Sequence, residues 1–570
     1  MSEELSTLTL GELRARLKTL GEPVSGSKAV LVTRLTAIDQ TSLVDSLASS
    51  SSEAWRRASS ASWQIGGFVL TLPALLIALI IITGGVGLGV IASNFLFDKE
   101  PDYQLMDFDP ASAREYAQGL VEIGNPGRLS GSVQEQATAD SIQENLTAMG
   151  LTVEFESFSV PMFEILDEPE LAYCIPGTYF GFITPTPCGP ADIDADIRTF
   201  THLEDFVLQG YSGSRDIRFN MNEYTIVNLS NGSDEDLWSA SEGQVGMVWM
   251  ESTGVGSNTE LYGRARDGSL AGLIIVPTAG NNCRIPGLEG TCVPFFKTVN
   301  VNDLGTMPTD IPFMMVSNDV GSELMGTFAD KQNNSARLRL YTDMSNDGNL
   351  DVRVPCGVIS GRSDEMIILG GHHDTVYNGP GAVDDTSGVA TVLELARQFA
   401  MLEKDLGAPF YTMKFCTWGG EEEGLHGSTA YVELHAGELS KLLRLYINFD
   451  MPHVDLDPET RGNTIWFYGN GVQDIEHIDG IVKKFEQSNP ALASRYSLSS
   501  DHVPDDEMGC SSDHCPFVRE LNKDIVGSYG TGSWEYHTYK DDMSRFNEES
   551  LIVTGTVLGS YARYLSWGEA

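Results

Sequence analysis

The chain has 570 residues, 41% of them hydrophobic, and this length predicts three or four globular units. Its formal net charge of −44 lies after residue 97, because residues 1–97 hold seven basic and seven acidic side chains. The acidic excess predicts a heavily hydrated surface that repels nucleic acid and anionic lipid head groups, which argues against both as ligands of residues 98–570.

The first predicted element is a pair of short helices within residues 1–40, separated by "GEPVSGS". The unit resembles a SAP motif, whose pattern places a glycine and a lysine before the second helix, here Gly26 and Lys28. SAP motifs commonly bind DNA, and the resemblance implies DNA contacts by Arg14, Lys18, Lys28 and Arg34. The equal numbers of acidic and basic residues in this unit, five of each, fit protein docking or a purely structural role instead.

A Ser-rich stretch, residues 41–62, predicts a linker. Residues 63–97 contain no charged side chain, and their apolar run is long enough to cross a bilayer as one transmembrane helix. This run starts too late and is too long for a cleaved signal peptide. Arg56 and Arg57 precede it and acidic residues follow it, which predicts a cell membrane protein with a cytoplasmic N-terminus and a large extracellular or lumenal domain. A G-x-x-x-G pattern at Gly85 and Gly89 weakly suggests helix pairing in a homodimer.

All eight cysteines lie after residue 97, and this even number predicts disulfides formed in an oxidising compartment. The natural candidates are the close pairs Cys174/Cys188, Cys283/Cys292 and Cys510/Cys515, which leave Cys356 and Cys416. Spacing alone does not determine the connectivity. A bond between Cys510 and Cys515 would close a small loop around "SSDH". Four N-x-S/T sequons give weak support for a glycoprotein: Asn145, Asn228, Asn231 and Asn333.

The large acidic part divides into three stretches. Residues 98–165 predict two helices and a strand. Residues 166–338 contain short strands such as "GQVGMVWM" and "AGLIIVP" and resemble a protease-associated domain, a β-rich insert of several peptidase families. From residue 339 to 570, strands alternate with helices, which predicts an α/β fold with a mixed, mostly parallel sheet flanked by helices.

The stretch "GGHHDTVYNGPGAVDD", residues 370–385, carries the first candidate functional residues. Side chains alternate along a strand, so His372 and Asp374 share one face and His373 points away. A histidine beside a carboxylate suits a metal site, because the carboxylate orients the imidazole. Asp384 or Asp385 could reach the same point, while one of the two could instead cap the following helix.

Further acids and bases follow three other predicted strands or loops. "YTMKFCTWGG" leads to Glu421, Glu422 and Glu423, "LLRLYINFD" ends at Asp450, and "WEYHTYKDD" brings His537. Open α/β sheets place their sites at the carboxyl ends of strands, so these groups should converge. Two histidines and several carboxylates predict a divalent metal site; the N/O ligand set suits zinc, and there are enough ligands for two ions.

Several short motifs occur in the order found in one peptidase family: "GGHHDTV", "GAVDDTSG", "WGGEEEGLHGS", "NFD", "SSDHCPF" and "YHT". Residues 340–567, with the helical start near residues 105–160, resemble the M28 family of zinc-dependent metallopeptidases. The resemblance implies a zinc-exopeptidase-like fold with two zinc ions. It implies five zinc ligands: His372, Asp384, Glu422, Asp450 and His537.

The same resemblance implies that Asp384 bridges the two ions, Glu421 is the general base and Asp374 orients His372. It also implies a cis peptide bond at Asp384–Asp385. We expect Glu423 to be solvent-facing or structural. Ser512, Asp513 and His514 are expected around the metal site or in a pocket wall, and the structural histidines are expected to include His426, His453 and His502.

The expected function is a membrane-anchored exopeptidase that cleaves peptides with a metal-bridging hydroxide and the Glu421 general base. Family frequency favours an aminopeptidase over a carboxypeptidase. Three alternatives remain: a glutaminyl-cyclase-like transferase, a catalytically inactive receptor or scaffold, and a membrane tether that binds DNA through the SAP-like motif.

Overall fold

The computed structural model divides the chain into two compact units, residues 1–100 and 101–570. The residues whose structure it describes are 62–65, 68–71, 101–179, 182–183, 187–190, 192–329 and 336–568. The SAP-like motif with its four predicted DNA contacts, the linker except its last residue, and most of the predicted transmembrane span fall outside these ranges.

In the first unit, β1 (Ser62–Ile65) and β2 (Phe68–Thr71) pair as antiparallel strands. The sequence predicted the start of a transmembrane helix here, and this part of the prediction is wrong. The aromatic and β-branched residues of the two segments favour an extended backbone. Among the described residues, no helix combines the length and the apolar character that a membrane crossing requires.

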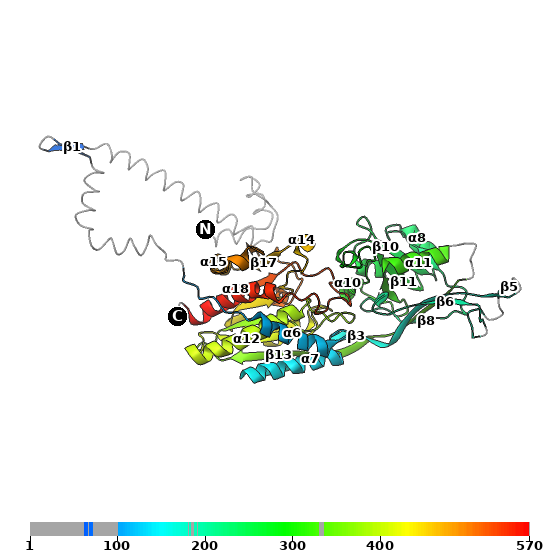
Figure 1. The fold of residues 1–570 in the computed structure, drawn as a ribbon, viewed down its shortest axis with the longest axis horizontal. Coiled ribbons are helices and arrows are strands. Elements are labelled where there is room, and N and C mark those ends of the chain that lie inside the picture. The colour runs from blue at the N-terminus through cyan, green and yellow to red at the C-terminus, as the bar shows by residue number, and fades with distance from the viewer. Residues whose placement is uncertain are drawn as a thin grey trace, which may run out of the picture. The chain divides into compact units, whose positions relative to one another are not determined.

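The second unit is built on a ten-stranded mixed sheet (Figure 1). Its central strands are parallel to their neighbours, whereas β13 runs antiparallel to both β15 and β3. The strands, in spatial order with β8 pairing beside β13, are β18 (Ser497–His502), β17 (Thr464–Gly469), β19 (Ile525–Tyr529), β16 (Leu443–Phe449), β14 (Met366–His372), β15 (Thr412–Trp418), β13 (Arg337–Ile359), β3 (Thr152–Ile175), β6 (Asp196–Phe200) and β8 (Arg215–Ile217). This confirms the predicted fold class.

Helices cover both faces of this sheet, because side chains alternate along its buried strands. In β14, Ile367 and Leu369 belong to one core and Met366 and Ile368 to the other. The helices packed in the first core are α6 (Pro110–Gly124), α7 (Val133–Met149), α12 (Thr386–Leu406), α15 (Val472–Ser488) and α18 (Glu548–Trp567). Those in the second are α13 (His426–Leu442) and α17 (His514–Arg519). Two short helices, α14 (Pro458–Arg461) and α16 (Pro490–Ala493), lie between the elements.

The inserted region has its own core and a second, five-stranded sheet. The long strands β3 and β13 pair along most of their length and lead from the main sheet into the insert (Figure 1). The sequence predicted a β-rich insert, and the structure adds several helices to it. Its elements are β4 (Thr178–Tyr179), β5 (Phe182–Ile183), β7 (Phe206–Leu208), β9 (Ile226–Asn228), α8 (Glu235–Ala240), β10 (Val245–Met250), α9 (Asn258–Asp267), β11 (Gly272–Pro277), η1 (Asn281–Cys283), α10 (Val301–Leu304), β12 (Phe313–Val316) and α11 (Asn318–Ala329).

All eight cysteines form disulfides. The structure pairs Cys174 with Cys188, Cys283 with Cys292, and Cys510 with Cys515, which confirms the close pairs favoured by the sequence. The remaining bond, Cys356–Cys416, joins residues that face each other in the register of the antiparallel strands β13 and β15. Cys174–Cys188 and Cys283–Cys292 lie in the insert, and Cys510–Cys515 joins the loop before α17 to the start of that helix.

Candidate metal centre

The candidate site lies where three neighbouring parallel strands end. His372 is the last residue of β14, Glu421 and Glu422 follow β15, and Asp450 follows β16. Because β14 is parallel to both neighbours, the carboxyl ends of all three strands lie at the same edge of the sheet. The predicted strand-end residues are therefore brought together by the fold.

His372 is buried and points its Nε2 atom at two carboxylates. Nε2 lies 3.2 Å from Asp384 Oδ1 and 3.9 Å from Asp450 Oδ1. On the opposite side of the ring, Nδ1 lies 3.5 Å from Asp374 Oδ1 and 3.2 Å from the Asp374 carbonyl oxygen. Contacts at Nδ1 hold the ring so that Nε2 is free for a metal, as in metal sites whose histidine is supported by a carboxylate.

A second group forms on the other oxygen of Asp384. His537 Nε2 lies 3.1 Å from Asp384 Oδ2 and 3.0 Å from Glu422 Oε2. In each group, His372–Asp384–Asp450 and Asp384–Glu422–His537, one ligand atom per residue lies within 4.8 Å of the others. Asp384 uses Oδ1 towards the first group and Oδ2 towards the second, so one carboxylate joins two metal-sized sites.

The chemistry of these two groups fits divalent cations. Carboxylates buried at this density are costly without compensating positive charge. Among the described residues, no lysine or arginine forms an ion pair with Asp384, Glu422 or Asp450. Glu422 Oε1 also lacks a hydrogen-bond partner in the described part of the chain. Imidazole nitrogens with carboxylate oxygens are a ligand set that zinc accepts.

Burial and neighbouring groups shift the pKa values of the carboxylates in opposite directions. Burial works to raise the pKa of Asp384, but hydrogen bonds from His372 and His537 outweigh it and lower that pKa. Burial raises the pKa of Glu421 well above its usual value, and the charges of Asp450 and Glu422 add to this against the field of His372. The site thus keeps one carboxylate charged and makes another a proton acceptor of raised basicity.

Asp374 holds both halves of the site. Its carboxylate accepts the backbone N–H groups of Glu421 and Glu422, each at 3.2 Å, in addition to facing His372. The hydroxyl of Ser130 donates to it at 3.1 Å. Asp374 is fully buried, so these contacts fix the glutamate loop relative to the imidazole.

The three consecutive glutamates have different surroundings. Glu421 Oε2 lies 4.0 Å from His372 Nε2, on the side of the first group, whereas Glu422 contacts His537 in the second. Glu423 is buried and accepts a hydrogen bond from Ser130. Of the two surroundings expected for Glu423, the solvent-facing one is wrong, because the chain turns after Glu422 and carries the third side chain back under Asp374.

Asp385 and Asp541 fix the segment that carries Asp384. Asp385 caps α12 by accepting the Gly388 N–H at 3.0 Å, and it also accepts the backbone N–H of His372 at 3.2 Å. The peptide bond between Asp384 and Asp385 is cis, as the resemblance implied. Asp541 accepts the N–H groups of Val383 at 2.9 Å and Asp384 at 3.1 Å. No local pattern in the sequence marks Asp541, which differs from other loop aspartates only in its position in the fold.

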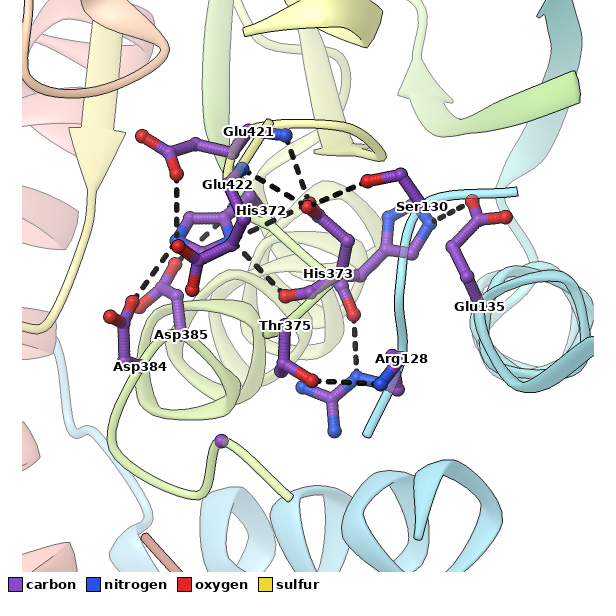
Figure 2. Close-up of polar contacts among 12 residues, drawn as sticks. Arg128, Ser130, Glu135, His372, His373, Thr375, Asp384, Asp385, Glu421 and Glu422 are labelled. Atoms are coloured by element: carbon purple, nitrogen blue, oxygen red, sulfur yellow. Dashed lines mark hydrogen bonds and ion pairs between the residues drawn. The ribbon is translucent and has the colours of Figure 1, made fainter. Parts of the chain in front are cut away.

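A buried arginine supports the loop that follows β14, and the sequence did not predict this role. Arg128 donates from Nε to the His373 carbonyl at 2.6 Å and from Nη2 to Thr386 Oγ1 at 2.6 Å. His373 Nε2 lies 2.9 Å from Glu135 Oε1 (Figure 2). His373 therefore packs away from the metal groups, as strand alternation predicted. No local pattern singles out Arg128 or Glu135, which lie more than 200 residues before their partners.

His537 is held by the insert. Its Nδ1 atom lies 2.9 Å from the Phe296 carbonyl oxygen, and the Phe296 N–H donates to the His537 carbonyl at 3.1 Å. The next residue, Lys297, donates to the Tyr536 hydroxyl at 2.8 Å. A loop of the insert thus orients a predicted metal ligand through main-chain atoms, which carry no side-chain signal in the sequence.

The other predicted residues lie around the centre. Ser512 accepts a hydrogen bond from Asn448 at 2.9 Å, and Asp513 is buried nearby. His514 Nε2 lies 2.9 Å from the Gly509 carbonyl oxygen. The remaining histidines make other contacts: His453 is buried, His426 is partly buried and His502 is exposed. None of these three belongs to the two candidate metal groups.

Comparisons with known proteins find similar peptidases. Residues 356–562 match the model of peptidase family M28, and residues 4–39 match the SAP domain. An aminopeptidase of Pseudomonas aeruginosa is 26% identical over 478 residues, covering 78% of each chain. Aminopeptidase YwaD of Bacillus subtilis is 24% identical over 360 residues, covering 62% of this chain and 69% of its own. A solved zinc aminopeptidase from Bacillus subtilis has a TM-score of 0.57 at 18% identity, covering 81% of this chain and 96% of that one.

The sheet, the strand-end ligands and the shared Asp384 define an α/β metallopeptidase with a zinc-exopeptidase-like fold. Residues 356–562 match peptidase family M28, and the protein is a zinc-dependent metallopeptidase with aminopeptidase homologues; residues 4–39 match a SAP domain.

Proposed function

We propose that the protein is an aminopeptidase that uses two zinc ions. The observation that carries the proposal is the pair of ligand groups that share Asp384, each with one histidine and a second carboxylate. His372 and Asp450 would hold one ion, and Glu422 and His537 the other. Zinc bound there would polarise the scissile carbonyl and lower the pKa of a water molecule towards neutrality.

Glu421 is proposed as the general base. Its carboxylate lies beside the first ligand group without belonging to either, at 4.0 Å from His372 Nε2. Burial raises its pKa, which makes its carboxylate a stronger base for accepting a proton from water, and the proton can then pass to the departing amine. Asp374 keeps Glu421 in place through the backbone N–H. In this proposal Glu421 transfers the proton and Asp374 positions Glu421.

The preference for an aminopeptidase is supported by the relatives, of which those from Pseudomonas aeruginosa and Bacillus subtilis bear that name. The zinc-loaded protein should be given three substrate sets in parallel: peptides with a free amino terminus, the same peptides N-acetylated, and peptides that begin with glutamine. We expect release of the first residue from the free peptides alone. Cleavage of the acetylated set from the carboxyl end, or cyclisation without hydrolysis, would overturn the proposal.

We also propose that the remaining apolar stretch, residues 72–97, anchors the protein in the membrane with the peptidase domain outside the cytoplasm. The proposal rests on the absence of charge in that stretch and on the disulfides of the peptidase part. External protease applied to intact cells should digest the large domain and spare an epitope placed before residue 60. Digestion of the epitope with protection of the large domain would contradict this topology.

We separately propose that the SAP domain binds DNA. The match of residues 4–39 to the SAP family supports this proposal. The full chain should bind duplex DNA with an affinity that falls as salt rises, and combined replacement of Arg14, Lys18, Lys28 and Arg34 by alanine should remove that binding. Binding that survives the replacement would show that these residues are not the contacts.

A further inference from the structure

A pocket of about 620 Å³ opens beside the candidate metal centre. Asp450 and Tyr536, the residue before His537, both line it. Aromatic side chains form much of its wall, including Trp466, Tyr468 and Tyr529. A substrate whose scissile bond lies at the metal centre would place a neighbouring group in this pocket.

Arg461 is the only lysine or arginine among the residues that line this pocket. Its Nε atom donates to the Thr531 carbonyl at 2.8 Å, and Nη1 donates to Asn281 Oδ1 at 2.6 Å. The guanidinium carbon lies 4.6 Å from the centre of the Trp534 ring. These contacts fix the guanidinium but do not neutralise it, because every partner is uncharged.

The carboxylates nearest to Arg461 form ion pairs with another arginine, Arg545. Asp455 Oδ1 lies 2.7 Å from Arg545 Nη2, and Glu535 Oε1 lies 3.0 Å from Arg545 Nε. Among the described residues, no carboxylate comes close enough to Arg461 to form an ion pair. This is unusual for a chain with 80 acidic and 36 basic side chains. The positive charge is therefore available to a ligand in the pocket.

A guanidinium has five N–H groups in a planar fork, which matches the two oxygens of a carboxylate. The contacts to Thr531 and Asn281 use one N–H on Nε and one on Nη1, which leaves three. The two other charged residues of the pocket are acidic: Asp450 belongs to the metal groups, and Asp501 is exposed at the rim, where it accepts a hydrogen bond from Ser499.

We propose that Arg461 binds a carboxylate of the peptide substrate and makes the enzyme prefer short or acidic peptides. This inference rests on the proposed peptidase function. The carboxylate can come from two sources: the free carboxyl terminus of a short peptide, or an acidic side chain next to the scissile bond. Asn281 belongs to the insert, so the insert helps to set the preference by holding the guanidinium in place.

Matched substrates distinguish the two sources. On the zinc-loaded full chain, kcat/KM is measured for Leu-Leu against Leu-Leu-amide, for Leu-Glu-amide against Leu-Gln-amide, and for Glu-Leu-amide against Gln-Leu-amide. We expect the carboxylate member of at least one pair to be favoured by about 10- to 100-fold, which is the range of a charged hydrogen bond. The first pair reports the carboxyl terminus and the other two report the side chain.

The same ratios are measured for Arg461→Gln and for Arg284→Gln. Arg284 is the matched control, because its guanidinium lies 5.1 Å from the centre of the same Trp534 ring but does not line this pocket. Each ratio compares two substrates on one enzyme, so a loss of folded protein cancels. We expect Arg461→Gln to bring the favoured ratio to about 1 and Arg284→Gln to retain it.

Three results have distinct meanings. Neutral peptides cleaved as fast as their carboxylate partners by the unaltered enzyme would overturn the role of Arg461 and leave the peptidase proposal standing. A preference that persists in Arg461→Gln would also overturn it. Failure of the zinc-loaded enzyme to cleave any peptide of the series would overturn the proposed function itself.

Discussion

The two ligand groups that share Asp384 are built in different ways. His372 ends a central parallel strand and is held by Asp374 and Asp385, all within 14 consecutive residues of the peptidase domain. His537 lies on a loop in a left-handed backbone conformation, with φ of 60°, and is held by the carbonyl of Phe296 from the insert. One half of the centre thus depends on local sequence, and the other depends on a contact between residues 241 positions apart.

This difference shows that the insert supports only one of the two ligand groups. The first group needs only the main sheet, because strand ends and a helix cap place its ligands. The second group requires the insert loop to dock on Tyr536 and His537. Changes in the insert should therefore affect the second group and leave the first intact.

The largest expected effect separates proton transfer from metal binding. Glu421→Gln should lower kcat by about 10²- to 10⁴-fold, the usual contribution of a general base, while both metal groups stay intact. Zinc content by atomic absorption is measured beside kcat. Glu423→Gln is the matched control, because that side chain is buried against Ser130 and an amide can replace it with little change in kcat or zinc. Loss of zinc in Glu421→Gln would show that its role is that of a ligand.

A smaller effect, on zinc affinity, should distinguish the His372 ligand group from the His537 ligand group. Glu422→Gln replaces an anionic ligand of the His537 group with a neutral amide, and Asp450→Asn does the same in the His372 group. Each should lower the affinity for one of the two proposed zinc ions by more than roughly 10- to 100-fold, the effect of losing a contact that only supports a ligand. Titration with a chelator should release one ion early and one late in both variants. Simultaneous release of both ions would contradict two separable groups.

The stability of the peptidase half can be tested without touching a ligand. His453 is fully buried and its Nε2 atom accepts the backbone N–H of Asn547 at 2.7 Å. Burial lowers the pKa of His453 to about 3, so the folded state holds it neutral while the unfolded chain protonates it near pH 6.5. The unfolded state binds more protons between these values, and stability falls as pH decreases through that window.

From pH 7 to pH 5, His453 alone should cost about 2 kcal/mol of unfolding free energy, because each pH step of one below the pKa of the unfolded chain costs roughly 1.4 kcal/mol. Urea unfolding of the chelator-treated protein at both pH values, beside His453→Gln, measures this contribution. The variant should lose less stability than the unaltered protein over the same range. Equal losses in the two proteins would show that the imidazole is not held neutral.

The same contrast explains how far the sequence predicted the site. Alternation along β14 placed His372 and Asp374 together and turned His373 away, and the ends of β15 and β16 placed the glutamates and Asp450. These relations are local or follow from parallel strands. Asp541, Arg128 and Phe296 were missed because each acts through or upon main-chain atoms far away in sequence, and such contacts leave no local pattern.

The insert shows the same limit on a larger scale. Its buried strands, such as β10 and β11, were recognisable as apolar runs with β-branched residues. The helices between them were not, because a segment such as α8 has six residues and one buried side chain, too short for a helical period to be detected. The predicted protease-associated character of the insert stays a prediction.

The last prediction tests directly whether the insert supports the second ligand group. Lys297→Met removes the hydrogen bond to the Tyr536 hydroxyl and the ammonium that lies 4.6 Å from that ring centre, but it keeps an apolar chain of similar length. Tyr536 precedes His537, so a looser Tyr536 should relax the loop and lower the affinity of the second zinc ion by up to about 10-fold, at the low end for a supporting contact.

Lys540→Met is the matched control for this change, because Lys540 makes the same kind of contact with the neighbouring Tyr539, at 4.9 Å from its ring centre, outside the insert. Chelator titration should show earlier release of one ion in Lys297→Met and unchanged release in Lys540→Met. Since the His372 group is built within the peptidase domain, the later ion should be released as in the unaltered protein. If Lys297→Met shifted the release of both ions equally, the insert would support the centre as a whole, and the division into a local half and a dependent half would be wrong.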